Sequence, residues 1–283
     1  MDPMPRRLTP AAALLACLAL PGQGVAQDEP ITLADDPFQI TDPRSTPPGE
    51  VSASAVGSYD RAPRGRVRDT YGLETTLSTG LTPDLDLRFG QTGAYGNLDI
   101  RRRLGTLSGA GTGVGDEEGA RAELGGTTRI GALYQVSRES GALPTIGVVG
   151  RLRALYGPGR PSQEAEAAAL FGKTLVGGAL PLGIGLNVGV VQRFDPLPQE
   201  RPTRTFINAS LGQAISRDTA LVVTYAREQQ ERGDLDYSLI QAGVRHRLRG
   251  QGAVIGVAAG FGLNRDSPEF QLALGIQWSL GGR

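Results

Sequence analysis

Large apolar residues alternate with small or polar residues over most of the chain after residue 50. The clearest example is FQLALGIQWSL, residues 270–280, in which Gln, Ala, Gly, Gln and Ser separate the large apolar positions. A period of two residues places the two sets of side chains on opposite faces of a β-strand. The pattern therefore predicts a chain built almost wholly of strands. Only residues 164–170 have a composition that could form a short helix.

The alternation divides the chain into about twelve strands. Most have roughly 9–12 residues, the length that a tilted strand needs to cross a bilayer. The predicted strands lie near residues 51–59, 71–81, 85–89, 127–138, 144–156, 166–177, 184–194, 203–214, 220–228, 237–248, 253–263 and 270–280.

The connections between these strands alternate in length, which is independent information on the fold. The tight connections are 82–84, 139–143, 178–183, 215–219 and 249–252. The longer and more polar connections are 91–126, 157–165, 195–202, 229–236 and 264–269. Outer-membrane barrels have short periplasmic turns, longer outside loops and an even number of strands. We predict an all-β fold over residues 50–283, a closed antiparallel up-and-down transmembrane β-barrel.

Composition supports a barrel that has lipid on one face and a polar lumen on the other. Only 39% of the residues are hydrophobic, while 41 of the 283 residues are glycine. A closed barrel satisfies its backbone hydrogen bonds in lipid without a continuous apolar core. A secreted soluble barrel or sandwich would also alternate, but its buried face would favour bulky residues rather than Gly, Ala, Ser, Thr and Gln. The membrane barrel is the preferred interpretation.

The first 26 residues have the pattern of a cleaved secretory signal. Arg6 and Arg7 precede an apolar run over residues 11–20, and Gly-Val-Ala at 24–26 is a typical cleavage site. In an alternative interpretation, Leu-Leu-Ala-Cys at 14–17 is a lipobox and Cys17 carries a lipid. Residues 27–49 are rich in Pro and Asp and predict an extended periplasmic segment. The expected location is the outer membrane of a Gram-negative cell.

The expected partners follow from this location. They are outer-membrane lipid and lipopolysaccharide, the outer-membrane insertion machinery and a small-molecule solute. Asp and Glu together number 29, equal to Lys and Arg together, and this balance argues against nucleic acid as a partner.

Three stretches resemble a family of Gram-negative outer-membrane proteins described for the MetA pathway of phenol degradation. They are GLTPDLDLRFG at 80–90, GGTTRIGALYQV at 125–136 and GFGLNRDSPEFQLALGIQWSL at 260–280. The resemblance implies a transporter-like outer-membrane barrel for small, including aromatic, compounds, and it implies no catalytic residues. The chain departs from the usual barrel pattern at its end, where Gly-Gly-Arg stands in place of a terminal aromatic residue.

Assigning the apolar face to lipid fixes which polar residues face the lumen. The predicted lumen-lining residues are Asp86, Arg88, Arg129, Arg151, Arg153, Lys173, Arg193, Arg245 and Arg247, accompanied by Gln135, Asn187, Gln271 and Gln277. Basic residues outnumber acidic ones in this set, and fixed positive charge in a pore favours anions. The sequence leaves two hypotheses open: a narrow pore for anionic or polar solutes, or arginines that pair with Asp86, Glu74 and loop carboxylates and fill the lumen.

The sequence offers little for catalysis. His246 is the only histidine and Cys17 the only cysteine, so we expect no metal site and no cofactor. A membrane-embedded lipid hydrolase that uses His246 on the lipid face is the weaker alternative. Glycines at 109–115 and the acidic run at 116–118 lie in the longest predicted loop. They fit a flexible loop and a solvated charge run better than a nucleotide or cation site.

The final strand is expected to close the barrel against the first. Phe270 and Trp278 lie on its lipid face near its two ends, where membrane-interface aromatic residues belong.

Overall fold

A computed structural model describes residues 31–63, 66–96, 98, 122–157, 161–198, 200–230, 232–249 and 252–281. The predicted signal sequence and its alternative lipid site at Cys17 lie outside the described residues. So do the glycine-rich and acidic stretches of the longest connection, at 109–118.

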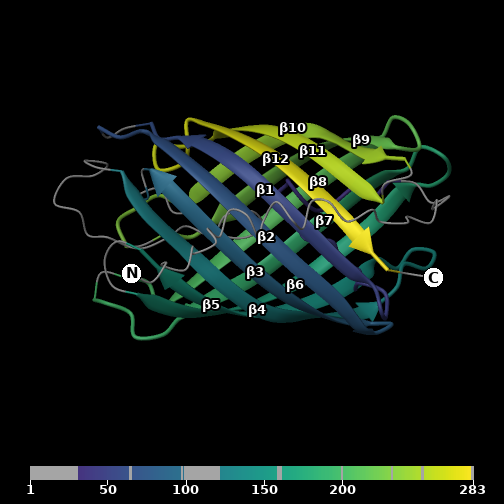
Figure 1. Ribbon diagram of the computed structural model, residues 1–283, viewed down its shortest axis with the longest axis horizontal. Coiled ribbons are helices and arrows are strands. Elements are labelled where there is room, and N and C mark those ends of the chain that lie inside the picture. The colour runs from purple at the N-terminus through teal and green to yellow at the C-terminus, as the bar shows by residue number, and fades with distance from the viewer. Residues whose placement is uncertain are drawn as a thin grey trace, which may run out of the picture.

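Twelve antiparallel strands form one closed barrel (Figure 1). The strands are β1 (Val51–Arg61), β2 (Asp69–Thr82), β3 (Leu85–Gly96), β4 (Glu123–Ser137), β5 (Thr145–Tyr156), β6 (Ser162–Val176), β7 (Leu182–Arg193), β8 (Thr203–Ala214), β9 (Thr219–Glu228), β10 (Tyr237–Leu248), β11 (Ala253–Gly262) and β12 (Phe270–Leu280). Each strand pairs with its neighbours in sequence, and β12 closes on β1 from Val51 opposite Leu280 to Arg61 opposite Phe270. The predicted fold class is confirmed.

The strand boundaries mostly follow the sequence alternation, and the main differences lie at glycine-rich or alanine-rich places. β3 continues to Gly96, well beyond the predicted end at residue 89, because it pairs with β4 as far as Glu123. Residues 164–170, the one possible helix, are part of strand β6 instead. Their Glu-Ala-Glu-Ala pattern has the period of a strand, and pairing on both sides overrides the helical preference of alanine.

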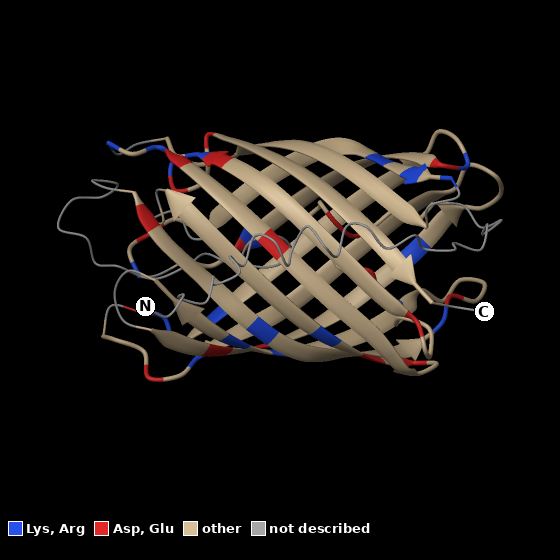
Figure 2. Cartoon of the chain, in the orientation of Figure 1, with Lys and Arg blue, Asp and Glu red and all other residues tan. Residues whose placement is uncertain are grey.

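The outer surface of the barrel is apolar. In β12, Leu272 and Leu274 are 42% and 61% exposed, whereas their neighbour Gln271 is 2% exposed and faces the lumen. Large exposed apolar side chains occur on the outward positions of all the other strands except β1. Figure 2 shows the charged residues mainly near the two ends of the barrel and at a few positions along the strands. The described residues contain no helix long and apolar enough to cross a membrane.

Residues 31–49, here called the inner segment, lie inside the barrel. The segment begins at the end with the tight turns, where Ile31 N donates to Arg217 O at 3.3 Å. Phe38, which is fully buried, packs with Ile40 against the lumen face of β1, β9, β11 and β12. The segment then returns to the same end, where Pro48 forms a bridge to Gly80. Its described part has no regular secondary structure, and it lies folded back on itself in the lumen.

Glycines line the lumen wall where the inner segment passes. At each of these positions a Cβ atom would lie 3.0 Å or less from an atom of the segment, so a larger residue would displace it. The contacts join Leu33 to Gly183 and Gly212, Pro37 to Gly256 and Gly275, and Pro43 to Gly147 and Gly172. The wall and the segment are therefore matched in shape, and part of the high glycine content has a structural cause.

Candidate functional site: the lumen and its inner segment

Arg88 and Asp86 form a two-point ion pair on the lumen face of β3. Arg88 Nε lies 2.9 Å from Asp86 Oδ1, and Arg88 Nη2 lies 3.0 Å from Oδ2. Asp86 also accepts a hydrogen bond of 2.9 Å from the backbone N–H of Thr46 in the inner segment. The carboxylate of Asp86 thus neutralises Arg88 and also binds Thr46, in the part of the inner segment that leads back to the tight-turn end.

A second wall pair joins Arg129 on β4 to Glu74 on β2. Both side chains are almost completely buried, at 8% and 5% exposure. The two strands are separated by β3, whose Gly90 leaves room for the Arg129 guanidinium to cross. The pairing of wall arginines with Asp86 and Glu74 is what the filled-lumen hypothesis predicts.

Seven charged residues, here called the outer charge layer, occupy the lumen near the end with the long connections. They come from β5 to β9 and the β7–β8 connection: Arg153, Glu164, Glu166, Arg193, Glu200, Arg204 and Glu228. Glu164 is at the centre, paired with Arg204 and lying 3.1 Å from Arg193 Nη2 and 3.7 Å from Arg153 Nη1. All three of these arginines are at most 1% exposed. Charges taken out of water to this degree must be paired.

Four carboxylates surround the three arginines of this layer. Arg153 pairs with Glu166, and Arg193 Nη1 lies 2.7 Å from Glu200 Oε1 in the connection between β7 and β8. Arg204 Nε lies 3.9 Å from Glu228 Oε1. The outer charge layer is therefore not a ring of positive charge, and these contacts favour the paired interpretation of Arg153 and Arg193.

Arg151 and Arg245 connect the wall to the inner segment. Arg151 Nη1 lies 3.4 Å from Glu166, and its Nη2 donates to Thr41 Oγ1 at 3.4 Å. Arg245 Nη1 donates to Thr32 O at 2.9 Å and also to Ala34 O. Both arginines face the lumen in the structure, and a chain segment fills the space in front of them.

The two remaining predicted lumen residues lie closer to the tight-turn end. Arg247 shares the lumen face of β10 with Arg245 and is partly exposed. Lys173 lies at the rim, where its Nζ is 2.9 Å from Glu139 Oε1 and also bonds backbone carbonyls of the β4–β5 turn. Its neighbour Gly172 contacts Pro43 of the inner segment, so the alternation turns Lys173 away from the central lumen.

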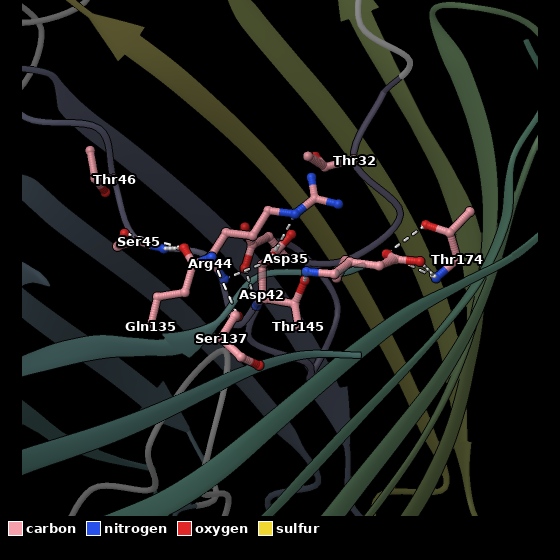
Figure 3. A network of polar contacts seen from close by, with 12 residues as sticks. Thr32, Asp35, Asp42, Arg44, Ser45, Thr46, Gln135, Ser137, Thr145 and Thr174 are labelled. Carbon is pink, nitrogen blue, oxygen red and sulfur yellow. Dashed lines mark hydrogen bonds and ion pairs between the residues drawn. The ribbon is translucent and has the colours of Figure 1, made fainter. Parts of the chain in front are cut away.

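Polar contacts fix the inner segment to itself and to the wall (Figure 3). The backbone N–H groups of Asp42 and Arg44 donate to Asp35 Oδ1 and Asp42 Oδ1 at 3.0 and 2.9 Å, which folds the segment back on itself. Ser45 N donates to Gln135 Oε1 on β4 at 3.3 Å. Asn187, another predicted lumen residue, lies beside Thr41.

Cavities lie between the segment and the wall, and two of them are defined by described residues. The larger, about 850 Å³, is lined by the segment, by strands β4 to β8 and by residues of the tight turns. The smaller, about 80 Å³, lies in the middle of the lumen among Asp35, Asp36, Glu74, Arg88, Arg129 and Arg151. Of these two cavities, the one at the tight-turn end is therefore about ten times larger than the one in the middle.

Part of the lumen is apolar, which differs from the predicted polar interior. Six buried side chains on the lumen faces of β4 to β8 form one cluster: Leu133, Val149, Ala168, Leu170, Val191 and Phe206. The cluster lies beside the outer charge layer, since Val191 pairs with Glu166 and Phe206 with Glu228 in the strand register. It supplies packing that a water-filled lumen would not have.

Comparisons with known proteins show the fold. No family model and no curated protein matches the chain. An outer-membrane channel of Pseudomonas putida F1 is 14% identical, with a TM-score of 0.55 over 86% of this chain and 100% of that one. The KdgM porin is 8% identical, with a TM-score of 0.52 over 81% and 99% of the two chains. The β domain of the Bordetella autotransporter BrkA is 12% identical, with a TM-score of 0.50 over 81% and 98%.

This chain therefore has the fold of outer-membrane barrels, two of which are named as a channel and a porin. The resemblance to the MetA-pathway family stays a prediction.

Several lumen residues were missed at the sequence level. Glu164 and Glu166 alternate with alanines, and reading the stretch as a strand would have placed both carboxylates in the lumen. Arg204 and Glu228 lie at strand ends, where the face is hard to assign. Nothing in the sequence signals that Asp35 and Asp36 enter the barrel, because the inner segment has no periodicity.

The outward residues lie where the alternation places them. Trp278 faces outward near the tight-turn end between Ala53 and Ala253. Near the other end, Phe270 packs against Phe261 in a tilted arrangement, with 5.4 Å between the ring centroids. His246 is exposed near the tight-turn end, and its Nδ1 lies 2.9 Å from Thr219 Oγ1. The described residues hold no group of three or more His, Cys, Asp or Glu arranged for a metal ion.

Proposed function

We propose that the chain is a β-barrel of the Gram-negative outer membrane, with the tight turns in the periplasm. The apolar outer surface and the fold shared with outer-membrane channels support this placement. Trp278 and Phe270 then lie at the two membrane interfaces, and the barrel contacts outer-membrane lipid and lipopolysaccharide. Assembly would require the outer-membrane insertion machinery, and export a cleaved signal over residues 1–26.

We further propose that the barrel is a transporter-like channel for small solutes, closed by its own inner segment. The observation that carries this proposal is that the wall encloses a chain segment that enters and leaves at one end. Small eight-stranded barrels fill their interiors with wall side chains, whereas large porins leave an aqueous channel. Twelve strands give a lumen of intermediate width, and here a separate segment fills much of it.

The charged and apolar residues that line the lumen support a proposed class of solute. Around the inner segment the wall presents five arginines, Arg88, Arg129, Arg151, Arg245 and Arg247, against three carboxylates, Glu74, Asp86 and Glu166. This excess of positive charge favours small polar or anionic solutes once the segment moves. The apolar cluster beside the outer charge layer would suit aromatic parts of a solute, in line with the family resemblance.

Reversal potentials in a salt gradient across a planar bilayer test this function. The purified full chain should open at least transiently, with currents that prefer anions over cations. Absence of current under all voltages would contradict the channel, while a cation preference would contradict the solute class only.

A structural or adhesion barrel with a filled lumen is the second candidate. It is favoured because both the inner segment and the outer charge layer occupy the lumen. It predicts no conductance even when the inner segment is removed. The lipid hydrolase has weaker support, because His246 lies near the end proposed as periplasmic. Phospholipid turnover that is lost in His246→Ala would revive it.

A further inference from the structure

Arg245 on β10 is a fully buried lumen arginine whose hydrogen bonds go mostly to the inner segment. Its Nη1 donates to Thr32 O at 2.9 Å, to Thr32 Oγ1 at 3.1 Å and to Ala34 O. Its Nη2 donates to Gln277 Oε1 on β12 at 3.0 Å, which is the hydrogen bond that joins the guanidinium to a wall side chain among the described residues. The side chain is 0% exposed.

Arg245 differs from the other wall arginines in the kind of partner it has. Arg88, Arg129 and Arg151 each form an ion pair with a wall carboxylate. In the described part of the chain, no carboxylate lies within ion-pair distance of Arg245. Asp35, Asp36 and Asp42 of the segment nevertheless act on its charge from farther away. A buried guanidinium held by neutral oxygens is costly, so a fold without a use for it would be expected to replace it.

The partners of Arg245 in the inner segment, Thr32 and Ala34, would move away from it together with the segment. If the inner segment leaves, Arg245 keeps only Gln277 and becomes a positive charge in a hydrated lumen. A guanidinium presents two parallel donors that match the geometry of a carboxylate or phosphate. The amide of Gln277 beside it offers a further donor or acceptor.

We propose that Arg245 is the binding residue for a small oxyanion solute, a carboxylate or a phosphate, in the open lumen. In the closed state the carbonyl oxygens of Thr32 and Ala34 occupy the place of the solute oxygens, so the inner segment is a built-in competitor. This inference rests on the proposed channel, because it assigns the solute class and the residue that recognises it.

Binding to a barrel that lacks residues 31–47 tests the proposal without requiring conduction. The precursor keeps its first thirty residues for export, and the folded barrel is studied in detergent by titration calorimetry. Succinate and inorganic phosphate are the probes, and a preference for one of them distinguishes the two sources of oxyanion. The deletion barrel should bind at least one probe, and the full chain should bind it about tenfold more weakly or not measurably, since the segment competes.

Substitutions in the deletion barrel separate recognition from general charge. Arg245→Gln should weaken binding about tenfold or more, as expected for losing a charged hydrogen-bonding partner. Arg245→Lys keeps the charge but not the paired donors, so its affinity should be intermediate. Arg249→Gln is the control: it removes a charge at the β10–β11 turn, where Arg249 is exposed and pairs with Asp218, and it should change affinity less than threefold. Heat-dependent migration in gels confirms that each variant is folded.

A synthetic peptide of residues 31–47 should bind the deletion barrel and displace the probe. Binding of neither probe, or equal affinity in the parent and Arg245→Gln, overturns the assignment. Conductance of the deletion barrel is recorded in parallel. Current without dependence of binding on Arg245 defeats this inference and leaves the channel standing, whereas Arg245-dependent binding without current defeats the channel alone.

Discussion

At the scale of single residues, Asp36 links the position of the inner segment to pH. Burial raises the pKa of this carboxyl from its ordinary 3.8 to about 6; Glu74 adds to the shift by repulsion, while Ser54 and Arg245 oppose it. Asp36 belongs to the segment and to no strand, so its ordinary pKa returns when the segment leaves. The inserted state then binds more protons between pH 4 and 6 than the released state does.

Acidification should therefore favour insertion. Lowering the pH from 7.5 to 5 should reduce the open probability of the channel. Asp36→Asn should weaken this dependence and keep the channel more closed at pH 7.5; the remainder is expected from Asp42, whose pKa is also raised by burial in the same segment. A shift of this size corresponds to roughly 1–3 kcal/mol between the two states. Single-channel recordings at several pH values measure it. A rise in open probability on acidification would show that the sign is wrong.

Glu164 should be the charged residue whose loss destabilises the barrel most. It is buried among Arg153, Arg193 and Arg204, so Glu164→Gln leaves three guanidinium groups without their shared carboxylate. Removing one partner of a buried ion pair costs on the order of 3–5 kcal/mol. The temperature of unfolding in detergent, followed by circular dichroism, measures the loss.

Glu139→Gln is the matched control for this prediction. Glu139 pairs with Lys173 at the rim, where both side chains are partly exposed. A partly exposed pair contributes much less than a buried one, typically under about 1 kcal/mol. Equal losses of stability in the two variants would contradict the central role of Glu164.

At the scale of elements, β12 is the strand that closes the barrel by pairing with β1. Its outward face carries Trp278 at the tight-turn end, next to the seam with β1. Trp278→Asp places a charge at the membrane interface and removes its aromatic residue, so the fraction of assembled barrel in cells should fall severalfold. Removal of residues 281–283 should be tolerated. Ser279→Asp, on the opposite face, is the control, and normal assembly of Trp278→Asp would contradict the role assigned to this strand.

The inner segment can be locked to the wall with a single disulfide. A Cβ atom at Gly275 would lie 3.0 Å from Cβ of Pro37, and a disulfide needs about 3.5–4.5 Å, so a small adjustment suffices. The chain has one cysteine, Cys17, within the predicted signal. The double variant Pro37→Cys/Gly275→Cys should give no current when it is oxidised. After reduction, its open probability should equal that of the two single cysteine variants under the same reducing conditions. Current through the oxidised protein would place the conducting path elsewhere.

At the scale of the whole molecule, the sequence predicted the wall well and its contents poorly. Strand number, closure by β12 and the outward position of Trp278 follow from a period of two residues, which each strand carries locally. In the structure the arginines assigned to the lumen face inward, whereas Lys173 lies at the rim. Their partners were less visible, because Glu164 and Glu166 lie in an alanine-rich stretch with mixed helical and strand signals.

The position of the inner segment in the lumen could not be predicted from local sequence patterns, because its contacts are with residues far away in the chain. Arg245 bonds Thr32 across 213 residues of sequence, and Gln39 bonds Tyr237 across 198. Such contacts depend on the closed barrel and on wall glycines that leave space for the segment. Neither feature can be read from the sequence of residues 31–49. A stretch rich in Pro and Asp therefore has the sequence character of an exposed lead-in although it lies in the lumen.

The central claim is that the inner segment closes a channel formed by the wall. Conductance in planar bilayers, compared between the full chain and a barrel lacking residues 31–47, tests it most directly. The deletion barrel should show long-lived, anion-preferring openings, whereas the full chain should be mostly closed under the same voltage and salt. Equal conductance in the two proteins, or none in a folded deletion barrel, would contradict the account.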